Sequence, residues 1–479
     1  MSEGMRPSQE PSCVSRRRLM LSTACGFGYV AFADLAARAA LRVDSDDPLA
    51  ARPPMLPGRA KRVIFLFMHG GPSHVDTFDH KPRLNRLDGK TASFDRTRFG
   101  KAERQTLLGS PWKFERHGQS GRWVSSLFPH VAKRVDDLCM IHSMNTNGTD
   151  HGQATLFMHT GATSLIRPSV GSWVCYGLGT ENENLPGFVT ICPNSNIGGS
   201  RAYSSAFLPA AYQGTALGRA EHPATEAVFR NVVDTSSPRV SRERRMELLR
   251  NLNQIQVDGQ ADAAALHATV NSFETAFRMQ QFAPSVTSLD DESAETLALY
   301  GVGQKETDDF ARQCLLARRL SEAGVRFVQV NYTDNKNTPK WDQHQNLKED
   351  HEAHARAVDQ PIAALLSDLK RRGLLDDTLV WFSGEFGRTP YSESGTGRDH
   401  NPFGFTTWLA GGGVKAGANH GCTDDLGMAA AQDKVHTHDL HATLLRLLGL
   451  DHLRLTYRYA GRDFRLTDVA GEVIQDVIA

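Results

Sequence analysis

The sequence predicts an α/β fold in which helices cover both faces of a largely parallel central sheet. Residues 62–68 are apolar throughout after the first residue, a pattern typical of a strand buried on both faces. From residue 310 onward, helical and strand patterns alternate, as they do in folds built from parallel strands. Side chains that bind metals follow several predicted strands, where open α/β sheets place their ligands.

Composition is that of an ordinary folded protein without a general affinity for polyanions. The 479 residues are 40% hydrophobic and 23% charged, and Lys plus Arg equal Asp plus Glu at 54 each. The length allows two or three domains, or one large α/β domain with insertions. Because the net charge is zero, we expect no nucleic acid partner.

The first 40 residues have the pattern of a twin-arginine signal peptide. A twin arginine at 16–17 precedes a weakly hydrophobic run over 19–35 and small residues over 36–40 that suit signal peptidase. A linker, Pro-rich in its second half, follows over 41–60. We therefore expect export by the twin-arginine pathway to the periplasm or another extracytoplasmic space. Two glycines and an aspartate interrupt the run, so we expect no stable transmembrane span, and a weak lipobox before Cys25 leaves a lipid anchor as a minor alternative.

The first half of the remaining chain combines strands, short helices and irregular segments. A basic, Gly-rich stretch over 81–122 has little periodicity and predicts an excursion over the surface. Helical spacing over about 236–301 predicts a helical insertion that forms a lid or an interaction surface. The other elements expected before it are helices over 127–134, 153–159 and 169–179 and strands over 138–144 and 188–192.

The second half alternates more regularly. Gly324 and Gly373 follow two helical patterns at the position where helices commonly end, and Pro361 predicts a kink within the second helix. The expected elements are a helix over 310–323, a strand over 325–332, a helix over 352–372, strands over 378–382 and 403–409, and a helix from 436 to 449.

Five loops between predicted elements carry side chains that bind metals. Since the carboxyl ends of parallel strands share one edge of the sheet, these side chains can meet there. The loops hold Asp76, residues 149–151, Asp342 with His344, residues 385–400 and residues 436–441. The alternative is that such residues cap helices and satisfy loop backbone groups, which suffices for Asp439 and Ser383.

The donor set consists of imidazole and carboxylate without thiolate. It suits zinc, manganese or iron, and a carboxylate-rich subset would suit calcium or magnesium; zinc is the divalent metal we expect first. Two metals about 4 Å apart would clamp a phosphoryl or sulfuryl group during transfer. Five of the seven cysteines lie beyond the signal peptide without a CxxC pair, so neither a zinc–thiolate site nor a disulfide framework is predicted.

Several motifs are similar to those of one bacterial protein family. They lie at residues 68–79, 341–344, 384–390, 397–402 and 451–462. On these motifs the chain resembles a twin-arginine-exported family of unknown function within the alkaline phosphatase and sulfatase superfamily. The resemblance implies an alkaline-phosphatase-like three-layer sandwich over residues 61–479, with a mostly parallel central sheet and the helical insertion.

The resemblance also implies site residues. His400 or His420 would replace the histidine that follows the carboxylate in the superfamily, because Phe386 stands there. The position of the superfamily's nucleophile aligns with His151, whose side chain has no hydroxyl. The implied metal ligands are Asp76, Asp342, His344, Glu385 and His438, with His400 as the replacement.

The implied chemistry departs from that of the superfamily. No Cys is followed by the Pro-Ser-Arg pattern that formylglycine formation needs, so an ordinary sulfatase is disfavoured. Covalent catalysis would need Thr149 or Thr146, or His151 itself; without a nucleophile, metal-activated water attacks directly, which is the mechanism to test first. In that scheme His151 acts as a base or anion contact, and Arg388 binds the substrate oxyanion.

Two functions follow from these expectations. The first is an exported, metal-dependent hydrolase of phosphate or sulfate esters whose substrate is a small molecule or a glycan. The alternative is a catalytically altered member of the fold that binds metal, glycan or a protein partner. In the alternative, the insertion over 236–301 could form the docking surface for a protein.

Overall fold

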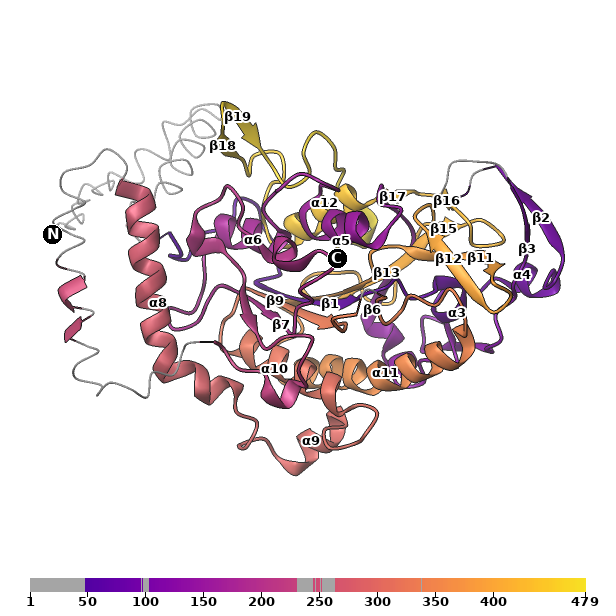
Figure 1. Ribbon diagram of the computed structural model, residues 1–479, viewed down its shortest axis with the longest axis horizontal. Coiled ribbons are helices and arrows are strands. Elements are labelled where there is room, and N and C mark those ends of the chain that lie inside the picture. Colours follow the sequence, from indigo (N-terminus) through magenta and orange to yellow (C-terminus); the bar gives the residue numbers. More distant parts are fainter. Residues whose placement is uncertain are drawn as a thin grey trace, which may run out of the picture. The chain divides into compact units, whose positions relative to one another are not determined.

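A sheet of nine strands forms the centre of the fold in the computed structural model (Figure 1). The structure describes residues 48–95, 97, 103–230, 244–245, 247–249, 251, 263–336 and 338–479, with the backbone alone for 263–272. The strand order is β14-β6-β13-β10-β1-β9-β7-β8, and β17 also pairs with β6. The strands are β1 (Arg62–Met68), β6 (Leu138–Asn145), β7 (Phe188–Ile191), β8 (Thr215–Leu217), β9 (Phe327–Tyr332), β10 (Thr378–Ser383), β13 (Phe405–Ala410), β14 (Asn419–His420) and β17 (Val435–His436).

Strand β13 runs antiparallel to both of its neighbours, β10 and β6, and every other pairing in the sheet is parallel. The predicted α/β class with a mostly parallel sheet is confirmed. The reversal of β13 follows from its connection, because a hairpin and not a helix separates it from β10. A parallel neighbour would need a crossover, usually helical, between the two strands.

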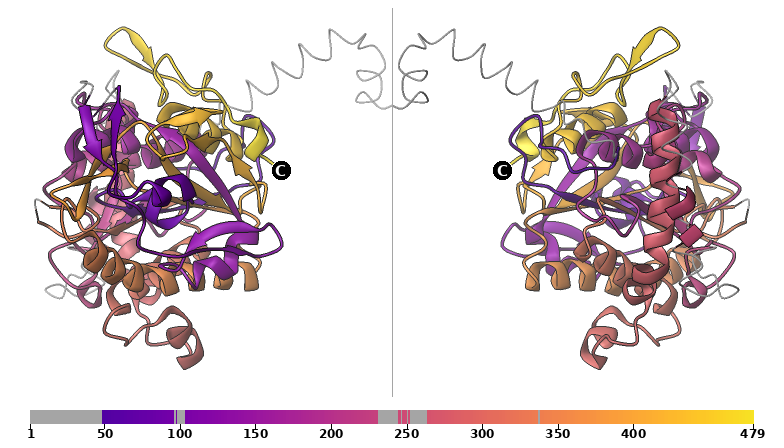
Figure 2. Two further views of the ribbon diagram at one scale, coloured as in Figure 1. Left: turned by 90° about the vertical axis from the view of Figure 1, so that its right-hand side faces the viewer. Right: turned by 90° about the vertical axis from the view of Figure 1, so that its left-hand side faces the viewer.

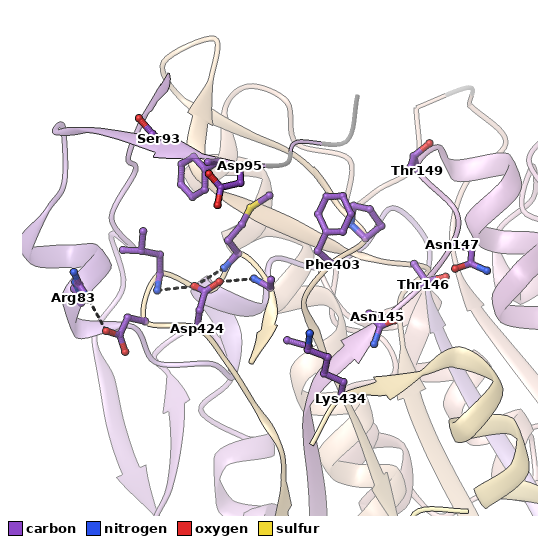
Figure 3. Close-up of a pocket in the computed structure, with 17 residues that line it drawn as sticks. Arg83, Ser93, Asp95, Asn145, Thr146, Asn147, Thr149, Phe403, Asp424 and Lys434 are labelled. Atoms are coloured by element: carbon purple, nitrogen blue, oxygen red, sulfur yellow. Dashed lines mark hydrogen bonds and ion pairs between the residues drawn. The ribbon is translucent and has the colours of Figure 1, made fainter. Parts of the chain in front are cut away.

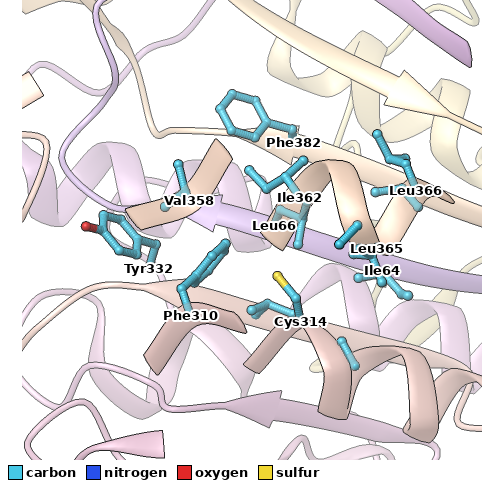
Figure 4. Close-up of a cluster of buried hydrophobic side chains, with 14 of the residues drawn as sticks. Ile64, Leu66, Phe310, Cys314, Tyr332, Val358, Ile362, Leu365, Leu366 and Phe382 are labelled. Carbon is cyan, nitrogen blue, oxygen red and sulfur yellow. The ribbon is translucent and has the colours of Figure 1, made fainter. Parts of the chain in front are cut away.

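Alternate side chains of β1 enter two different hydrophobic layers. Ile64 and Leu66 pack with side chains of α10 (Asp308–Glu322) and α11 (Leu347–Arg371) (Figure 4). Val63 and Phe65 pack on the opposite face, which is covered by α6 (Val170–Leu178) and α12 (Thr437–Leu447). Because side chains alternate along a strand, a wholly apolar β1 requires helices on both faces. Figures 1 and 2 show these two helical layers on opposite sides of the sheet.

Shorter elements surround these layers. The remaining helices are α3 (His74–Thr77), α4 (Pro82–Arg86), α5 (His151–Thr160), α8 (Ala263–Thr287) and α9 (Ala294–Tyr300), with 3-10 helices η1 (Val131–Asp137), η2 (Gly199–Tyr203), η3 (Ala210–Tyr212), η4 (Ala224–Glu226) and η5 (Gln475–Val477). Five two-stranded sheets pair β2 (Thr91–Phe94) with β3 (Glu103–Thr106), β4 (Phe114–His117) with β5 (Arg122–Ser125), β11 (Gly387–Glu393) with β12 (Gly397–Asn401), β15 (Cys422–Thr423) with β16 (Ala430–Gln432), and β18 (Tyr457–Tyr459) with β19 (Arg462–Phe464).

The structure differs from the sequence-based expectations mainly outside the large sheet. The stretch over 81–122 contains α4 and two hairpins, whose four-residue strands are too short to give a clear period. The predicted helix over 127–134 is a 3-10 helix that begins at Val131. Helix α11 begins at Leu347 and continues through Pro361 to Arg371.

Two expectations fall wholly or partly outside the described residues. The predicted signal peptide over 1–40 lies outside them, as do residues 236–243, 246, 250 and 252–262 of the predicted insertion over 236–301. The described part of the insertion contains α8 and α9.

Residues 46–479 form one compact unit. Among the helices that the structure describes, none has both the length and the hydropathy needed to cross a bilayer.

Candidate metal centre

Four side chains converge at the edge of the sheet where the parallel strands end. His151 is the first residue of α5, Asp342 and His344 lie in the loop between β9 and α11, and His400 lies on β12. One ligand atom from each of the four lies within 4.8 Å of the others. We call these four residues the metal-centre cluster. Their convergence follows the rule that loops at the carboxyl ends of parallel strands share one site.

One oxygen of Asp342 lies at the middle of this cluster. Its Oδ1 is 2.9 Å from Nε2 of His344, 3.0 Å from Nε2 of His151 and 3.1 Å from Nε2 of His400. The Nε2 atoms of His344 and His400 are also 3.1 Å apart. Nε2 of His151 is buried, and Oδ1 of Asp342 is its polar neighbour. Three imidazoles therefore present the same nitrogen to one carboxylate oxygen.

The outer nitrogen of each imidazole contacts a protein oxygen. Nδ1 of His151 lies 2.6 Å from Oε1 of Glu385, and Nδ1 of His400 lies 3.1 Å from the carbonyl oxygen of Thr149. Nδ1 of His344 contacts Oε2 of Glu393. An ionised carboxylate or a carbonyl oxygen only accepts, so each Nδ1 carries a hydrogen. In the neutral rings, each Nε2 consequently carries a lone pair that faces Asp342.

The charges within the cluster are strongly coupled. Burial raises the pKa of Asp342, but hydrogen bonds from His151, His344 and His400 and the charge of Arg388 outweigh burial and hold that pKa well below the usual range. Burial lowers the pKa of His151, but its bonds to Asp342 and Glu385 outweigh burial and raise it. The bond to Asp342 also raises the pKa of His344. The cluster therefore favours positive charge beside this carboxylate, which protons or a metal cation can supply.

Arg388 holds Asp342 from the protein side. Its guanidinium is fully buried and donates to Oδ1 of Asp342 at 2.7 Å. The other N–H groups donate to the carbonyl oxygens of Gly70, Gly71 and Arg398. All three guanidinium nitrogens thus contact protein oxygens. The structure places Arg388 as a support for Asp342, whereas the sequence analysis expected it to bind a substrate oxyanion.

Glu385 lies behind His151 and outside the cluster. Both of its carboxylate oxygens accept from the backbone N–H of Gly70 at 3.0 Å. Gly70 has φ of 113°, and a Cβ at this position would lie 2.6 Å from the backbone nitrogen of Trp341. Glycine therefore allows the end of β1 to approach the segment that carries Asp342. Burial raises the pKa of Glu385, but the hydrogen bond and charge of His151 and the charge of His69 lower it overall.

The sequence places this chain in a known family. Residues 60–478 match the family described as "Protein of unknown function (DUF1501)". The chain belongs to the DUF1501 family. No curated protein matches the sequence.

Solved structures similar to this DUF1501 chain include proteins of the alkaline phosphatase and sulfatase kind. The lipoteichoic acid synthase LtaP from Listeria monocytogenes is 11% identical over 92% of this chain and 82% of its own, with a TM-score of 0.37. Alkaline phosphatase from the Antarctic bacterium TAB5 is 11% identical over 81% of this chain and 98% of its own, with a TM-score of 0.34. The PsFucS1 sulfatase from Pseudoalteromonas sp. is 11% identical over 87% of this chain and 71% of its own, with a TM-score of 0.32. Likeness at this level says nothing about the activity of the DUF1501 chain.

Two of the predicted metal ligands lie away from the cluster. Asp76 forms a fully buried ion pair with Arg398 at 2.7 and 3.1 Å and accepts from the hydroxyl of Ser73 at 2.5 Å. Nε2 of His438 donates to the carbonyl oxygen of Gly161 at 2.9 Å. The structure thus does not bring Asp76 or His438 to Asp342, because each already has a protein partner.

Sequence analysis missed the supporting residues on the β11–β12 hairpin. Glu393 contacts His344, and Arg398 pairs with Asp76. The sequence predicted a loop over 385–400, and it did not predict the hairpin register that brings Arg388 opposite His400. The alternative ligand His420 lies on β14, 3.8 Å from Asp476, and outside the cluster.

A hollow of about 1000 Å3 adjoins the cluster, and we call it the first hollow (Figure 3). Thr149 connects the two, because its carbonyl oxygen contacts His400 and the residue lines the hollow. Asn145, Thr146 and Asn147 continue the same wall, as Figure 3 shows. Thr149 and Thr146, the nucleophile candidates of the sequence analysis, therefore face this hollow and contribute no atom to the four-residue cluster.

Proposed function

We propose that this DUF1501 protein is a metal-dependent hydrolase of phosphate or sulfate esters. One observation carries the proposal: three imidazoles, each tethered through Nδ1, turn Nε2 toward a single oxygen of Asp342. Histidines that bind metals commonly donate their other ring N–H to a carboxylate or a carbonyl oxygen. His151, His344 and His400 all have such an acceptor.

The residues fit a divalent metal in spacing and in chemistry. Ligand atoms of a tetrahedral zinc ion lie roughly 3.3 Å from one another, given bonds of about 2.0–2.1 Å. Four separations among Asp342 Oδ1 and the Nε2 atoms span 2.9–3.1 Å, which is close to that value. Neutral Nε2 lone pairs repel the carboxylate and one another unless a cation lies among them. Three nitrogens and one oxygen suit zinc first, with manganese or iron as alternatives, and suit calcium or magnesium less well.

The protein residues have distinct roles in this proposal. A divalent metal held by the cluster would polarise an ester oxygen and lower the pKa of a water molecule. Asp342, His151, His344 and His400 would hold it, while Arg388 fixes the orientation of Asp342. The side chain of His344 is 31% exposed, compared with 6–11% for the other three, so the cluster opens to solvent beside His344. The alcohol portion of the substrate would occupy the first hollow.

The nucleophile is the least constrained part of the proposal. His151 occupies the position expected for a nucleophile, but both of its nitrogens face carboxylates, which leaves it no free nitrogen for phosphoryl transfer. None of the four cluster side chains has a hydroxyl or a thiol. We therefore favour attack by water over attack by His151, and retain the hydroxyl of Thr149 as an alternative nucleophile.

The same observation favours a second candidate function. A member of the fold that keeps its metal but has no hydroxyl or thiol at the cluster could bind metal without hydrolysing esters. Metal analysis of the purified protein does not by itself distinguish the two functions, since both require metal. Hydrolysis of aryl phosphate and aryl sulfate panels by the zinc-loaded protein separates them: turnover supports the hydrolase, and stoichiometric zinc without turnover on any ester supports the binding protein.

Export is part of the proposal as well. The twin arginine at 16–17, followed by a weakly hydrophobic run and small residues, supports transport by the twin-arginine pathway. Conversion of both arginines to lysine should retain the protein in the cytoplasm. Cell fractionation with antibody detection measures this, and unchanged export of the double variant would contradict the proposal.

A further inference from the structure

Two hollows share Asn147 as a lining residue, and Asn147 lies shortly before the metal-centre cluster in the chain. The first hollow has a volume of about 1000 Å3, and a second one has about 360 Å3. Asn147 lines both, and it lies between β6 and α5, four residues before His151. The two hollows together are far larger than a small ester bound at the metal-centre cluster would fill.

Three of the five charged side chains that line the first hollow have partners within the protein, and the other two, Asp95 and Lys434, are opposite in charge. The carboxylate of Asp424 accepts from the backbone N–H groups of three residues in its own loop. Arg83 and Asp425 form an ion pair at 2.6 Å, as Figure 3 shows. The wall nearest the cluster instead offers amide and hydroxyl groups, those of Asn145 and Thr146 among them, opposite the ring of Phe403 (Figure 3).

The second hollow has the same character. Gln153 and Ser164 offer neutral polar groups, and the rings of Trp173 and Phe207 form apolar walls. Its cationic side chains already have partners: the guanidinium of Arg167 lies 4.2 Å from the centre of the Phe464 ring, for example. Neutral hydrogen-bonding groups beside aromatic rings match a ligand with many hydroxyls and apolar faces better than they match a polyanion.

One residue that lines each hollow has a buried polar atom without a hydrogen-bond partner. These atoms are the hydroxyl oxygen of Thr146, a residue of the first hollow, and Nδ1 of His438, a residue of the second. Since Nε2 of His438 donates to Gly161, the neutral ring carries a lone pair on Nδ1. Buried polar groups in proteins are normally satisfied, so these two unpaired atoms mark a polar wall in each hollow.

We propose that the two hollows form one groove for a neutral, polyhydroxylated chain, that is, an oligosaccharide. The proposal rests on the proposed function in one respect: the chain would carry the ester that the metal centre cleaves. Asn147 would contact the chain where it passes from one hollow to the other. The residues that the sequence analysis assigned to metal and nucleophile, His438 and Thr146, would then serve to bind substrate.

Titration calorimetry of the mature protein with neutral, unesterified oligosaccharides of increasing length tests the groove. We expect the longest chains to bind at least about tenfold more tightly than the single sugar. Asn147→Ala and Gln153→Ala should remove most of this advantage. Asn196→Ala is the matched control, because Asn196 is exposed and lines neither hollow. Affinity independent of chain length, or preference for a peptide or a polyanion, would overturn the inference.

The same measurements separate failure of the groove from failure of the proposed function. His344→Ala should abolish ester hydrolysis and leave oligosaccharide binding unchanged, because His344 lines neither hollow. Chain-length-dependent binding without any metal-dependent hydrolysis would refute the hydrolase and support the groove. Hydrolysis of aryl esters by a protein that binds no oligosaccharide would support the hydrolase and refute the groove.

Discussion

Nε2 of His344 lies 2.9 Å from Oδ1 of Asp342, and the ring is held in this orientation by Glu393 at its other nitrogen. His344 is also the most exposed member of the metal-centre cluster. It is therefore the ligand whose removal should disturb the fold least. A variant of His344 therefore tests metal binding at the cluster directly, without an activity measurement.

His344→Ala should lower bound zinc from stoichiometric to trace levels after dialysis. It should also remove the rise in Tm on addition of zinc, because a ligand that binds only the native state stabilises it. Elemental analysis and thermal unfolding with and without zinc measure both effects. His222→Ala is the matched control, since His222 is exposed and pairs with Glu226 away from the cluster. Retention of stoichiometric zinc by His344→Ala would contradict the assigned centre.

Glu393→Ala should weaken zinc binding without removing a ligand. Glu393 fixes the ring of His344 through Nδ1, and loss of such an outer partner typically weakens metal affinity by about 10–100-fold. Competition with a chromogenic chelator measures the dissociation constant directly. Glu393→Gln, which keeps an acceptor oxygen, should recover much of the affinity. Equal affinities for the Ala variant and the unaltered protein would show that Glu393 has no positioning role.

The buried part of the fold could be predicted from the sequence because its signals are local. An unbroken apolar run predicted β1 over 62–68, and the structure gives the same bounds. Helix α10 and strands β9 and β10 were likewise predicted to within two residues at each end. These elements are long or fully buried, so one period dominates each of them.

The candidate site could be predicted only in part, since pairing partners far apart in the chain leave no local signal. Asp342, His344 and His400 were expected as metal ligands, and the structure brings these three side chains together in one cluster. Asp76 was also expected there, but it pairs with Arg398. This arginine lies on β12, far from Asp76 in the sequence. A carboxylate that binds metal and one that binds a buried arginine look the same in a sequence.

Asp76→Asn tests which of these two roles is correct. If Asp76 serves the buried pair, removal of its charge leaves Arg398 buried and unpaired, and breaking such pairs typically costs about 3–5 kcal/mol of unfolding free energy. Urea denaturation should show this loss, while the folded variant keeps its zinc. In the double variant with Arg398→Met, part of the loss should be recovered. Loss of zinc without loss of stability would instead make Asp76 a metal ligand.

Buried histidines outside the metal-centre cluster should make the protein sensitive to acid. Burial lowers the pKa of His351 and His441 to about 3 and that of His69, His159 and His354 to about 4. The ordinary pKa of histidine is about 6.5, so below that pH the unfolded chain binds protons that the native protein does not. The unfolding free energy must then fall as the pH falls from about 6.5 toward the native pKa values, by up to about 1.4 kcal/mol per histidine and pH unit.

Three groups have the opposite effect on this dependence, namely Asp359 and the cluster histidines His151 and His344, because their native pKa values are raised. Burial raises the pKa of Asp359 to about 6, so the native carboxyl binds a proton that the unfolded one does not between about pH 6 and its ordinary pKa. The five buried histidines outnumber these three groups, and urea denaturation with a chelator present should give a lower unfolding free energy at about pH 5 than at about pH 7.5. His441→Gln should make the slope shallower, because Gln keeps a donor for the carbonyl oxygen of Met158 but does not titrate. The exposed His222→Gln should leave the slope unchanged, and a slope that is flat in the unaltered protein would show that these histidines are already protonated in the native state.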